Sequence, residues 1–385
     1  MPLKQIERND DDRLNWRYQD KTYNEMFKAW RKQRKDSVGF YYVSNPNELT
    51  YLDGYGFVTD YPEAAERSAL RRVMNVIGVT MMILGMIDIL YKFAVPELLS
   101  MLGADIYYDR YAKAFYGNEW LILGFDAFFS IIKRLIPLTY VCRMMRMPVK
   151  VMVPTKITNR TLFGYSIPIM LFTAGCCMAA SGSYGRILRL MHIEKNKLFE
   201  MPESKAVLVL FLILHIIIIP IISEIHTRGA LLQLLRQFGD GFAIVVTALL
   251  TALITYNLNT FCYMFVSALI IGYFTVRTGS VITAVLMRIT TVSVSYGIFA
   301  MSEYLDEDIR LIVSMTAALV ILLVGTIGFV KLMIKDSGSF ALNFKSRYLT
   351  FSDKCGIMAS SIPVVVGLTV IIIHTIINIS FTVSL

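Results

Sequence analysis

Residues Lys205–Gly241 read KAVLVLFLILHIIIIPIISEIHTRGALLQLLRQFGDG, a long apolar run that leads directly into charged residues. Its first part, residues 205–222, is almost purely apolar and is long enough, at about 1.5 Å per residue, to cross a bilayer core as a helix. The stretch then continues without a break into Glu224, His226 and Arg228. A spacing of four residues places Glu224 and Arg228 on one face of a helix. Charged groups there either face a protein interior or a water-filled cavity, or lie beyond the hydrocarbon edge as an interfacial ion pair.

The composition is that of a membrane protein. Of the 385 residues, 55% are hydrophobic and only 17% are charged, and the mean hydropathy is +0.55. Soluble domains carry about 25% charged residues. The net charge of +9 comes from basic residues scattered among loops between apolar segments, as in the cytoplasmic loops of membrane proteins. We therefore expect contact with membrane lipid and no binding of nucleic acid.

Apolar segments recur along the chain and predict an all-α polytopic transmembrane helical bundle of about nine spans. They lie at residues 73–95, 118–141, 163–183, 205–227, 241–257, 259–276, 280–300, 309–333 and 358–383. The distribution of Lys and Arg between them predicts a multi-pass protein of the cell membrane with a cytoplasmic N-terminus. The loop at residues 186–205 is basic although it should lie outside. Either the third span does not cross fully, or this loop is an amphipathic helix on the outer face.

We predict four regions along the chain. Residues 1–70 form a polar cytoplasmic segment, 71–204 hold three accessory spans, 205–300 form the core, and 301–385 hold two C-terminal spans. Within the first region, Met26–Lys35 mixes aromatic and basic residues and suits a membrane-surface helix or a solvated positive flank. The tyrosine-rich stretch Tyr41–Pro62 contains turn signals and suits either a small hairpin or a segment on the membrane interface.

Motifs in the predicted core resemble those of a known family. Pro220–Gly229 (PIISEIHTRG) resembles the pattern P-x-x-E-E-x-x-F-R-G of the CPBP family, also called Abi, the CAAX-processing and bacteriocin-processing intramembrane proteases. Leu231–Gly239, Ala243–Ala252 and Arg277–Ser280 resemble its later motifs, in the same order and spacing. The resemblance runs from Lys205 to Val292. It implies a CPBP-like helical core and an intramembrane endopeptidase ancestry.

This sequence departs from the family at the positions that carry the chemistry. The resemblance implies a membrane-buried site of glutamate and histidine side chains, in which the first glutamate activates water. Ser223 stands at the first glutamate position, and only the second, Glu224, is retained as the one candidate catalytic acid. Thr255 stands at the histidine position of the second motif. Arg288 and Val292 stand at the histidine and asparagine positions of the last.

Elementary chemistry points the same way. Serine and threonine do not act as general bases near neutral pH, and a metal site needs imidazole or carboxylate ligands. Arg288 is permanently cationic and only donates hydrogen bonds, so it would repel a divalent ion. We therefore predict no metal and no cofactor. We also predict a buried contact between Glu224 and Arg288 in place of a reaction centre, with Arg228 left for backbone carbonyls or a second acceptor.

The sequence thus favours a non-catalytic scaffold or regulator that binds another membrane protein or a lipid-modified peptide. Its expected groove is lined by Glu224, His226, Arg228, Thr251, Thr255 and Arg288. One alternative is an active CPBP-type endopeptidase of CAAX-like or leader-peptide type, including a relocated site built from Glu224, His226, His215 and His374. A transporter is a further alternative, because charged residues within spans are compatible with one.

Overall fold

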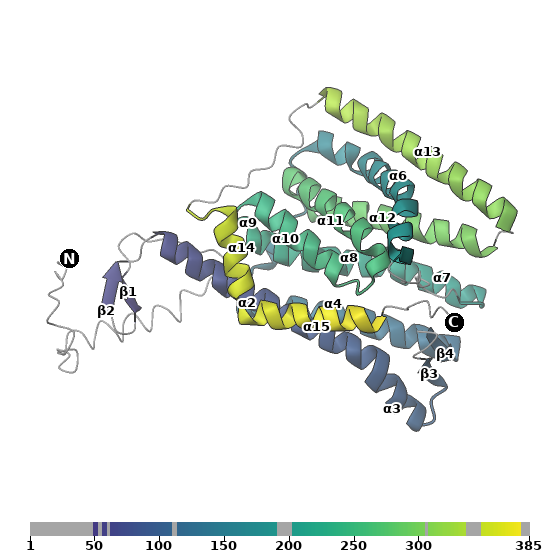
Figure 1. Ribbon diagram of the computed structural model, residues 1–385, viewed down its shortest axis with the longest axis horizontal. Helices are drawn as coiled ribbons and strands as arrows, with labels where there is room; N and C mark the ends of the chain where they lie inside the picture. The colour runs from purple at the N-terminus through teal and green to yellow at the C-terminus, as the bar shows by residue number, and fades with distance from the viewer. Residues whose placement is uncertain are drawn as a thin grey trace.

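The computed structural model describes residues 49–52, 56–59, 62–109, 114–190, 202–304, 307–335 and 348–378, which are mostly helical (Figure 1). The predicted Met26–Lys35 segment and most of the basic 186–205 loop lie outside these residues. The α-helices are α2 (Pro62–Ile89), α3 (Val95–Met101), α4 (Glu119–Met144), α5 (Val149–Met152), α6 (Arg160–Leu190), α7 (Lys205–Ile213), α8 (Ile219–Glu224), α9 (Leu232–Arg236), α10 (Asp240–Leu253), α11 (Leu258–Thr278), α12 (Val281–Tyr304), α13 (Glu307–Lys335), α14 (Phe351–Ser360) and α15 (Ile362–Asn378). Three π-helical segments, η2 (Leu90–Ala94), η3 (Leu214–Ile218) and η4 (Ile225–Leu231), join neighbouring α-helices.

Two small antiparallel hairpins accompany the helices. In the first, β1 (Leu49–Leu52) pairs with β2 (Gly56–Thr59), so the tyrosine-rich stretch holds the hairpin that its turn signals allowed. In the second, β3 (Ile106–Asp109) pairs with β4 (Ala114–Gly117) between α3 and α4.

The helices confirm a polytopic bundle. Fewer of them than expected are long and apolar enough to cross a membrane. Six helices of the described chain are long and apolar enough to cross a membrane, or seven if the bent pair of α14 and α15 is one span. Helix α10 has 14 residues and is about 21 Å long, which is shorter than the roughly 30 Å hydrocarbon core. Helix α4 carries Asp126, Lys133 and Arg134 and is not among the six. The expectation of about nine spans is therefore too high by this measure.

Residues 205–236 form one long helix whose first half is exposed and whose second half is buried. Residues 205–236 pass through η3 and η4 without interruption, and η3 ends just before Pro220, which has no backbone N–H to donate. Val209, Leu210 and Ile213 in the first half are exposed. In the second half Leu231, Leu232, Leu234 and Leu235 are at most 1% exposed. The hydrophobic core therefore centres on the junction between α9 and α10.

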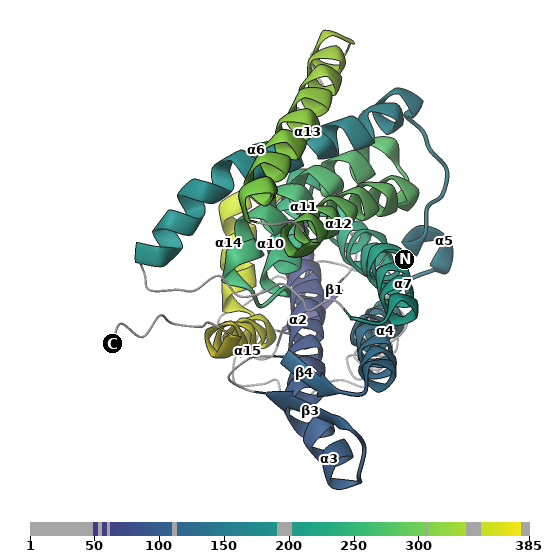
Figure 2. The same cartoon turned by 90° about the vertical axis from the view of Figure 1, so that its right-hand side faces the viewer.

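The accessory helices lie beside this core in two close pairs. Helix α2 packs along α15 and helix α6 along α13 (Figures 1 and 2). Glycines let the backbones of each pair approach, as is usual where membrane helices pack. Gly78 and Gly367 lie in the α2–α15 contact, and Gly325 and Gly328 lie in the α6–α13 contact.

A buried lysine on α14 connects the bent pair of α14 and α15 to the core. The Lys354 side chain on α14 is 0% exposed and its Nζ donates to the Phe238 carbonyl at 2.6 Å. That carbonyl follows the end of α9, where backbone acceptors lack helical partners. Nearby, the buried Glu66 at the start of α2 accepts from the Tyr348 backbone N–H at 2.9 Å.

We expect Gly78→Ala to destabilise the protein, because the new Cβ would overlap backbone atoms of Pro363 and Val364. Overpacking of this kind costs about 1–3 kcal/mol. Gly124→Ala on α4 is the matched control, because its Cβ would meet nothing within 4 Å, and it should be neutral or stabilising by about 0.5–1 kcal/mol. Thermal unfolding of the two purified variants in detergent measures the difference. Equal melting temperatures would contradict the close α2–α15 contact.

Candidate functional site

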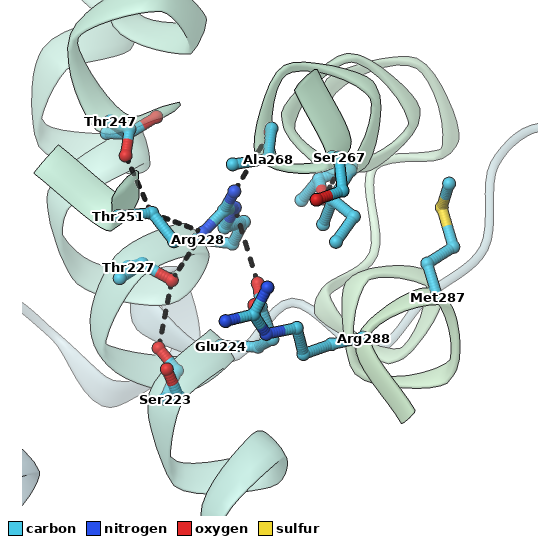
Figure 3. Close-up of polar contacts among 12 residues, drawn as sticks. Ser223, Glu224, Thr227, Arg228, Thr247, Thr251, Ser267, Ala268, Met287 and Arg288 are labelled. Carbon is cyan, nitrogen blue, oxygen red and sulfur yellow. Dashed lines mark hydrogen bonds and ion pairs between the residues drawn. The ribbon is translucent and has the colours of Figure 1, made fainter. Parts of the chain in front are cut away.

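Arg228 is the centre of the polar site in the core. Its side chain is completely buried, yet its guanidinium is bonded on several sides (Figure 3). Nη1 donates to the hydroxyls of Thr227 at 2.8 Å and Thr251 at 3.0 Å, and Nη2 donates to the Ala268 carbonyl at 2.9 Å. Nε lies 3.3 Å from Oε2 of Glu224. One side chain on η4 thereby ties together α8, α10 and α11.

Glu224 is shared by two guanidiniums. Its carboxylate is buried, with Oε2 facing Arg228 and Oε1 lying 3.8 Å from Nε of Arg288 on α12 (Figure 3). The predicted contact between Glu224 and Arg288 is therefore confirmed. Arg228 does donate to a backbone carbonyl and to other acceptors, as expected. It is not released from Glu224, however, because it also pairs with that carboxylate and at the shorter distance. Arg288 in addition places Nη1 3.3 Å from the sulfur of Met264.

The remaining predicted site residues lie around this cluster without joining its ion pairs. The Thr251 hydroxyl accepts from Arg228 and donates to the Thr247 carbonyl at 2.7 Å. Thr255 donates to the Ala252 carbonyl at 2.6 Å, at the end of its own helix. Ser223 offers its backbone carbonyl to the Thr227 hydroxyl at 2.9 Å, and its side chain is partly exposed. Val292 is half-buried on α12.

His226 is buried beside the cluster. It is 3% exposed, and its Nε2 has no hydrogen-bond partner among the described residues. A buried imidazole without a partner is costly. Nε2 of His226 is therefore a buried polar atom for which the described residues offer no hydrogen-bond partner.

A second charged cluster, which the sequence did not predict, joins α2, α4 and α15. Asp88 accepts from the Lys133 ammonium and lies 2.6 Å from Nε2 of His374 and 3.4 Å from Nζ of Lys92. Lys92 also donates to the Asn378 side-chain oxygen at 3.2 Å. The Tyr256 ring, from the loop between α10 and α11, packs against His374 with centroids 4.5 Å apart. This cluster connects the accessory helices to the core.

A third cluster surrounds Asp126 on α4. Its Oδ1 accepts from the hydroxyls of Tyr91 at 2.9 Å and Ser130 at 3.3 Å, and its Oδ2 lies 3.1 Å from Nε2 of His215. The other ring nitrogen of His215 lies 3.0 Å from the Phe211 carbonyl. His215 thus pairs with Asp126, and His374 with Asp88, so the described structure does not assemble them with Glu224 into a relocated site.

The π-helical segments supply many of these polar groups. Tyr91 and Lys92 lie on η2, His215 on η3, and His226 and Arg228 on η4. Such wide turns are frequent at functional sites, and no residue pattern marks them in a single sequence. Asp88 and Asp126 were visible in the sequence as charges within spans, but their partners were not. In the described part of the chain, no group of three or more His, Cys, Asp and Glu side chains is placed to hold a metal ion.

We expect Glu224→Gln and Arg228→Met each to destabilise the protein by about 3–5 kcal/mol, because each leaves a buried charge without its partner. The double variant should lose less than the sum of the two single losses. Arg277→Met, which changes an exposed arginine on α11, is the control and should be near neutral. Thermal unfolding in detergent measures all four. Additive losses in the double variant would show that the two side chains are not coupled.

Comparison with known proteins places the site within a family domain. Residues 205–294 match the family described as Type II CAAX prenyl endopeptidase Rce1-like. No curated protein and no solved structure matches the chain. The matched segment begins at α7 and ends within α12, so it includes Glu224, Arg228 and Arg288 and excludes the accessory helices. Residues 205–294 of this multi-pass membrane protein are therefore similar to the Rce1-like CAAX prenyl endopeptidases of the CPBP family.

Proposed function

We propose that the protein is a non-catalytic relative of the intramembrane proteases, a scaffold or regulator that binds another membrane protein or a lipid-modified peptide. We place it in the cell membrane with its N-terminus in the cytoplasm, as the distribution of basic residues indicates. One observation carries the proposal. Both oxygens of Glu224, the only retained acid of the family motif, face arginine side chains.

The surroundings of Glu224 are unsuited to general base catalysis. A base must offer a lone pair to the water that it activates and must gain a proton in the reaction. Both oxygens of the carboxylate instead face guanidiniums, which only donate hydrogen bonds: Arg228 at 3.3 Å and Arg288 at 3.8 Å. Glu224 is also fully buried. No hydrogen bond or ion pair of the described residues joins a histidine to it, and arginine, serine and threonine stand where the resemblance implies ligands and proton carriers.

A binding role uses the edge of the same site. Arg288 keeps 12% of its side chain exposed, Ser223 is partly exposed, and Ile221 on α8 is 36% exposed. This edge offers polar and apolar groups to a neighbouring helix or peptide, while Glu224 and Arg228 hold the helices behind it. Polar contacts between membrane helices contribute about 0.6–2 kcal/mol each, so several together give a specific and reversible complex.

An active endopeptidase is the second candidate. It is favoured by the match to the endopeptidase family over residues 205–294 and by the retained Glu224 and Arg228. The unpartnered Nε2 of His226 would be the first group to test as a proton carrier in that case.

We expect the purified protein to cleave no member of a panel of prenylated and leader-type peptides, and Glu224→Ala to leave that result unchanged. The quadruple variant Ser223→Glu, Thr255→His, Arg288→His, Val292→Asn restores the residues that the family resemblance implies and tests whether their replacement accounts for the missing activity. Mass spectrometry of the peptides after incubation is the readout. Cleavage by the native protein that is lost in Glu224→Ala would refute the non-catalytic reading and establish the enzyme.

We expect a photo-crosslinking residue at position 221 to capture a partner in native membranes. The same residue at position 334 is the control, because Ile334 on α13 is 80% exposed and lies outside the matched domain. Electrophoresis followed by mass spectrometry identifies the captured chain. Equal capture at both positions would indicate random collision in the membrane and would contradict a binding edge at α8.

A further inference from the structure

Helix α3 and the two strands that follow it, β3 and β4, form a small unit with an exposed apolar surface. We call it the α3–hairpin unit. Helix α3 has 7 residues, about 10 Å, and cannot cross a membrane by itself. At its end Leu98, Met101 and Leu102 are 57%, 78% and 75% exposed. Large apolar side chains gathered on one surface mark a contact with lipid or with another protein.

The unit has a packed interior of its own. The Ala104 N–H donates to the Leu99 carbonyl at 2.9 Å and closes the end of α3. Behind it, the Tyr108 ring lies between Phe93 and Phe115, with centroid distances of 5.9 and 5.0 Å. The strands are paired in register. The exposed apolar side chains are therefore presented on a supported surface.

Glu119 marks the level of the membrane surface beside this unit. Its carboxylate, at the start of α4, accepts from the backbone N–H groups of Glu203 at 2.9 Å and Ser204 at 3.1 Å. The apolar run of α7 begins directly after these two residues, so α4 and α7 begin at one level. The Asn118 N–H donates to the Asp105 carbonyl at 2.9 Å, which joins the unit to the start of α4. The α3–hairpin unit therefore lies at the membrane surface.

Helix α3 projects sideways from the bundle at this level. Figure 2 looks nearly along α7, which begins a candidate span, and in this view α3 lies at the edge of the molecule beyond α2 and the strands. Spans run within about 20° of the membrane normal on average, so this sideways direction follows the membrane surface. Met86 and Leu90, on the preceding turns of the same helical path, are also exposed. The apolar surface of α3 thus continues a surface that faces lipid.

Exposed aromatic side chains accompany the apolar ones. Tyr107 on β3 and Tyr116 on β4 are exposed, and their rings stack with centroids 5.6 Å apart. Trp120, the neighbour of Glu119, is 55% exposed. Tyrosine and tryptophan are enriched at membrane–water interfaces, where the ring contacts apolar groups and its polar atom contacts water. This composition favours lipid as the occupant of the surface.

We propose that the α3–hairpin unit is an interfacial lipid anchor. Leu98, Met101 and Leu102 insert among the acyl chains of one leaflet, and the three exposed aromatic residues lie at headgroup level. The unit enters the leaflet without crossing it, as interfacial amphipathic helices do. In the orientation proposed above, this is the outer leaflet. The anchor lies outside the matched domain, and it does not depend on whether the core is catalytic.

The test is quenching of tryptophan fluorescence in phosphatidylcholine liposomes, with one tryptophan at a time in the full-length protein. The chain has three tryptophans, and the background protein carries phenylalanine at all three positions. Leu102→Trp then reports the end of α3. Ile327→Trp, at an exposed position within the α13 span, is the control for lipid. Glu63→Trp, at an exposed position in the first turn of α2, is the control for water.

We expect brominated acyl chains to quench Leu102→Trp at least about twofold more strongly than Glu63→Trp, because interfacial helices lie about 5–10 Å deep in the headgroup and acyl boundary. Bromines near the headgroup should quench Leu102→Trp more than bromines near the chain end, and Ile327→Trp should show the reverse order. Iodide, present on both sides of the membrane, should quench Leu102→Trp less than Glu63→Trp.

Two results would overturn the proposal. Quenching of Leu102→Trp by iodide but not by bromine would place the end of α3 in water. Protection from both quenchers would assign the surface to a protein partner or to a second copy of the chain. Tyr107→Trp is a second probe if Leu102→Trp fails to fold. It should be quenched by bromines near the headgroup, and quenching by iodide alone would again contradict the anchor.

Discussion

The burial of one arginine constrains the centre of this molecule. Arg228 is fully enclosed, and a guanidinium in that position is tolerated only if its donors find acceptors and its charge finds a counter-charge. Thr227, Thr251, Ala268 and Glu224 meet those needs. They come from η4, α10, α11 and α8, so the positions of four elements follow from a single side chain. Arg288 on α12 also pairs with Glu224 and brings a fifth element into the cluster.

The segment that is similar to the protease family is held together by charged side chains. The ion pair of Glu224 and Arg228 holds helices together whether or not water is activated nearby. Arg288 on α12 adds a second cation near the same carboxylate. The accessory helices add two further carboxylates, Asp88 and Asp126, each held by a histidine and further donors. The described helices are therefore held together by polar contacts as well as by close packing at glycines.

The local features of this fold and the pairings of Glu224 could be predicted from the sequence, and the pairings of the accessory helices could not. Hydropathy located the helices, and a spacing of four residues placed Glu224 beside Arg228. The motif order brought Arg288 to Glu224. By contrast, Lys92 and Asn378 are 286 residues apart in the chain, and no periodicity relates them. The length of α10 was also overestimated, because the chain turns at Tyr256, whose φ of 49° ends the helical path earlier than hydropathy alone suggests. The three π-helical segments have no residue signature.

The pairing of α2 with α15 has a consequence for the order of assembly. A ribosome makes α2 before all the other helices described here, yet Gly78 and Asp88 on it meet residues of the last one, and Glu66 meets the segment just before α14. Asp88 therefore enters the membrane before His374 is synthesised. Until then Lys92 and Lys133 can supply its counter-charge. The finished bundle forms only after release of the C-terminal helices. A truncated mRNA would yield a chain without α15, in which Asp88 lies in the membrane without His374. Such an incompletely paired charge would mark the chain for quality control.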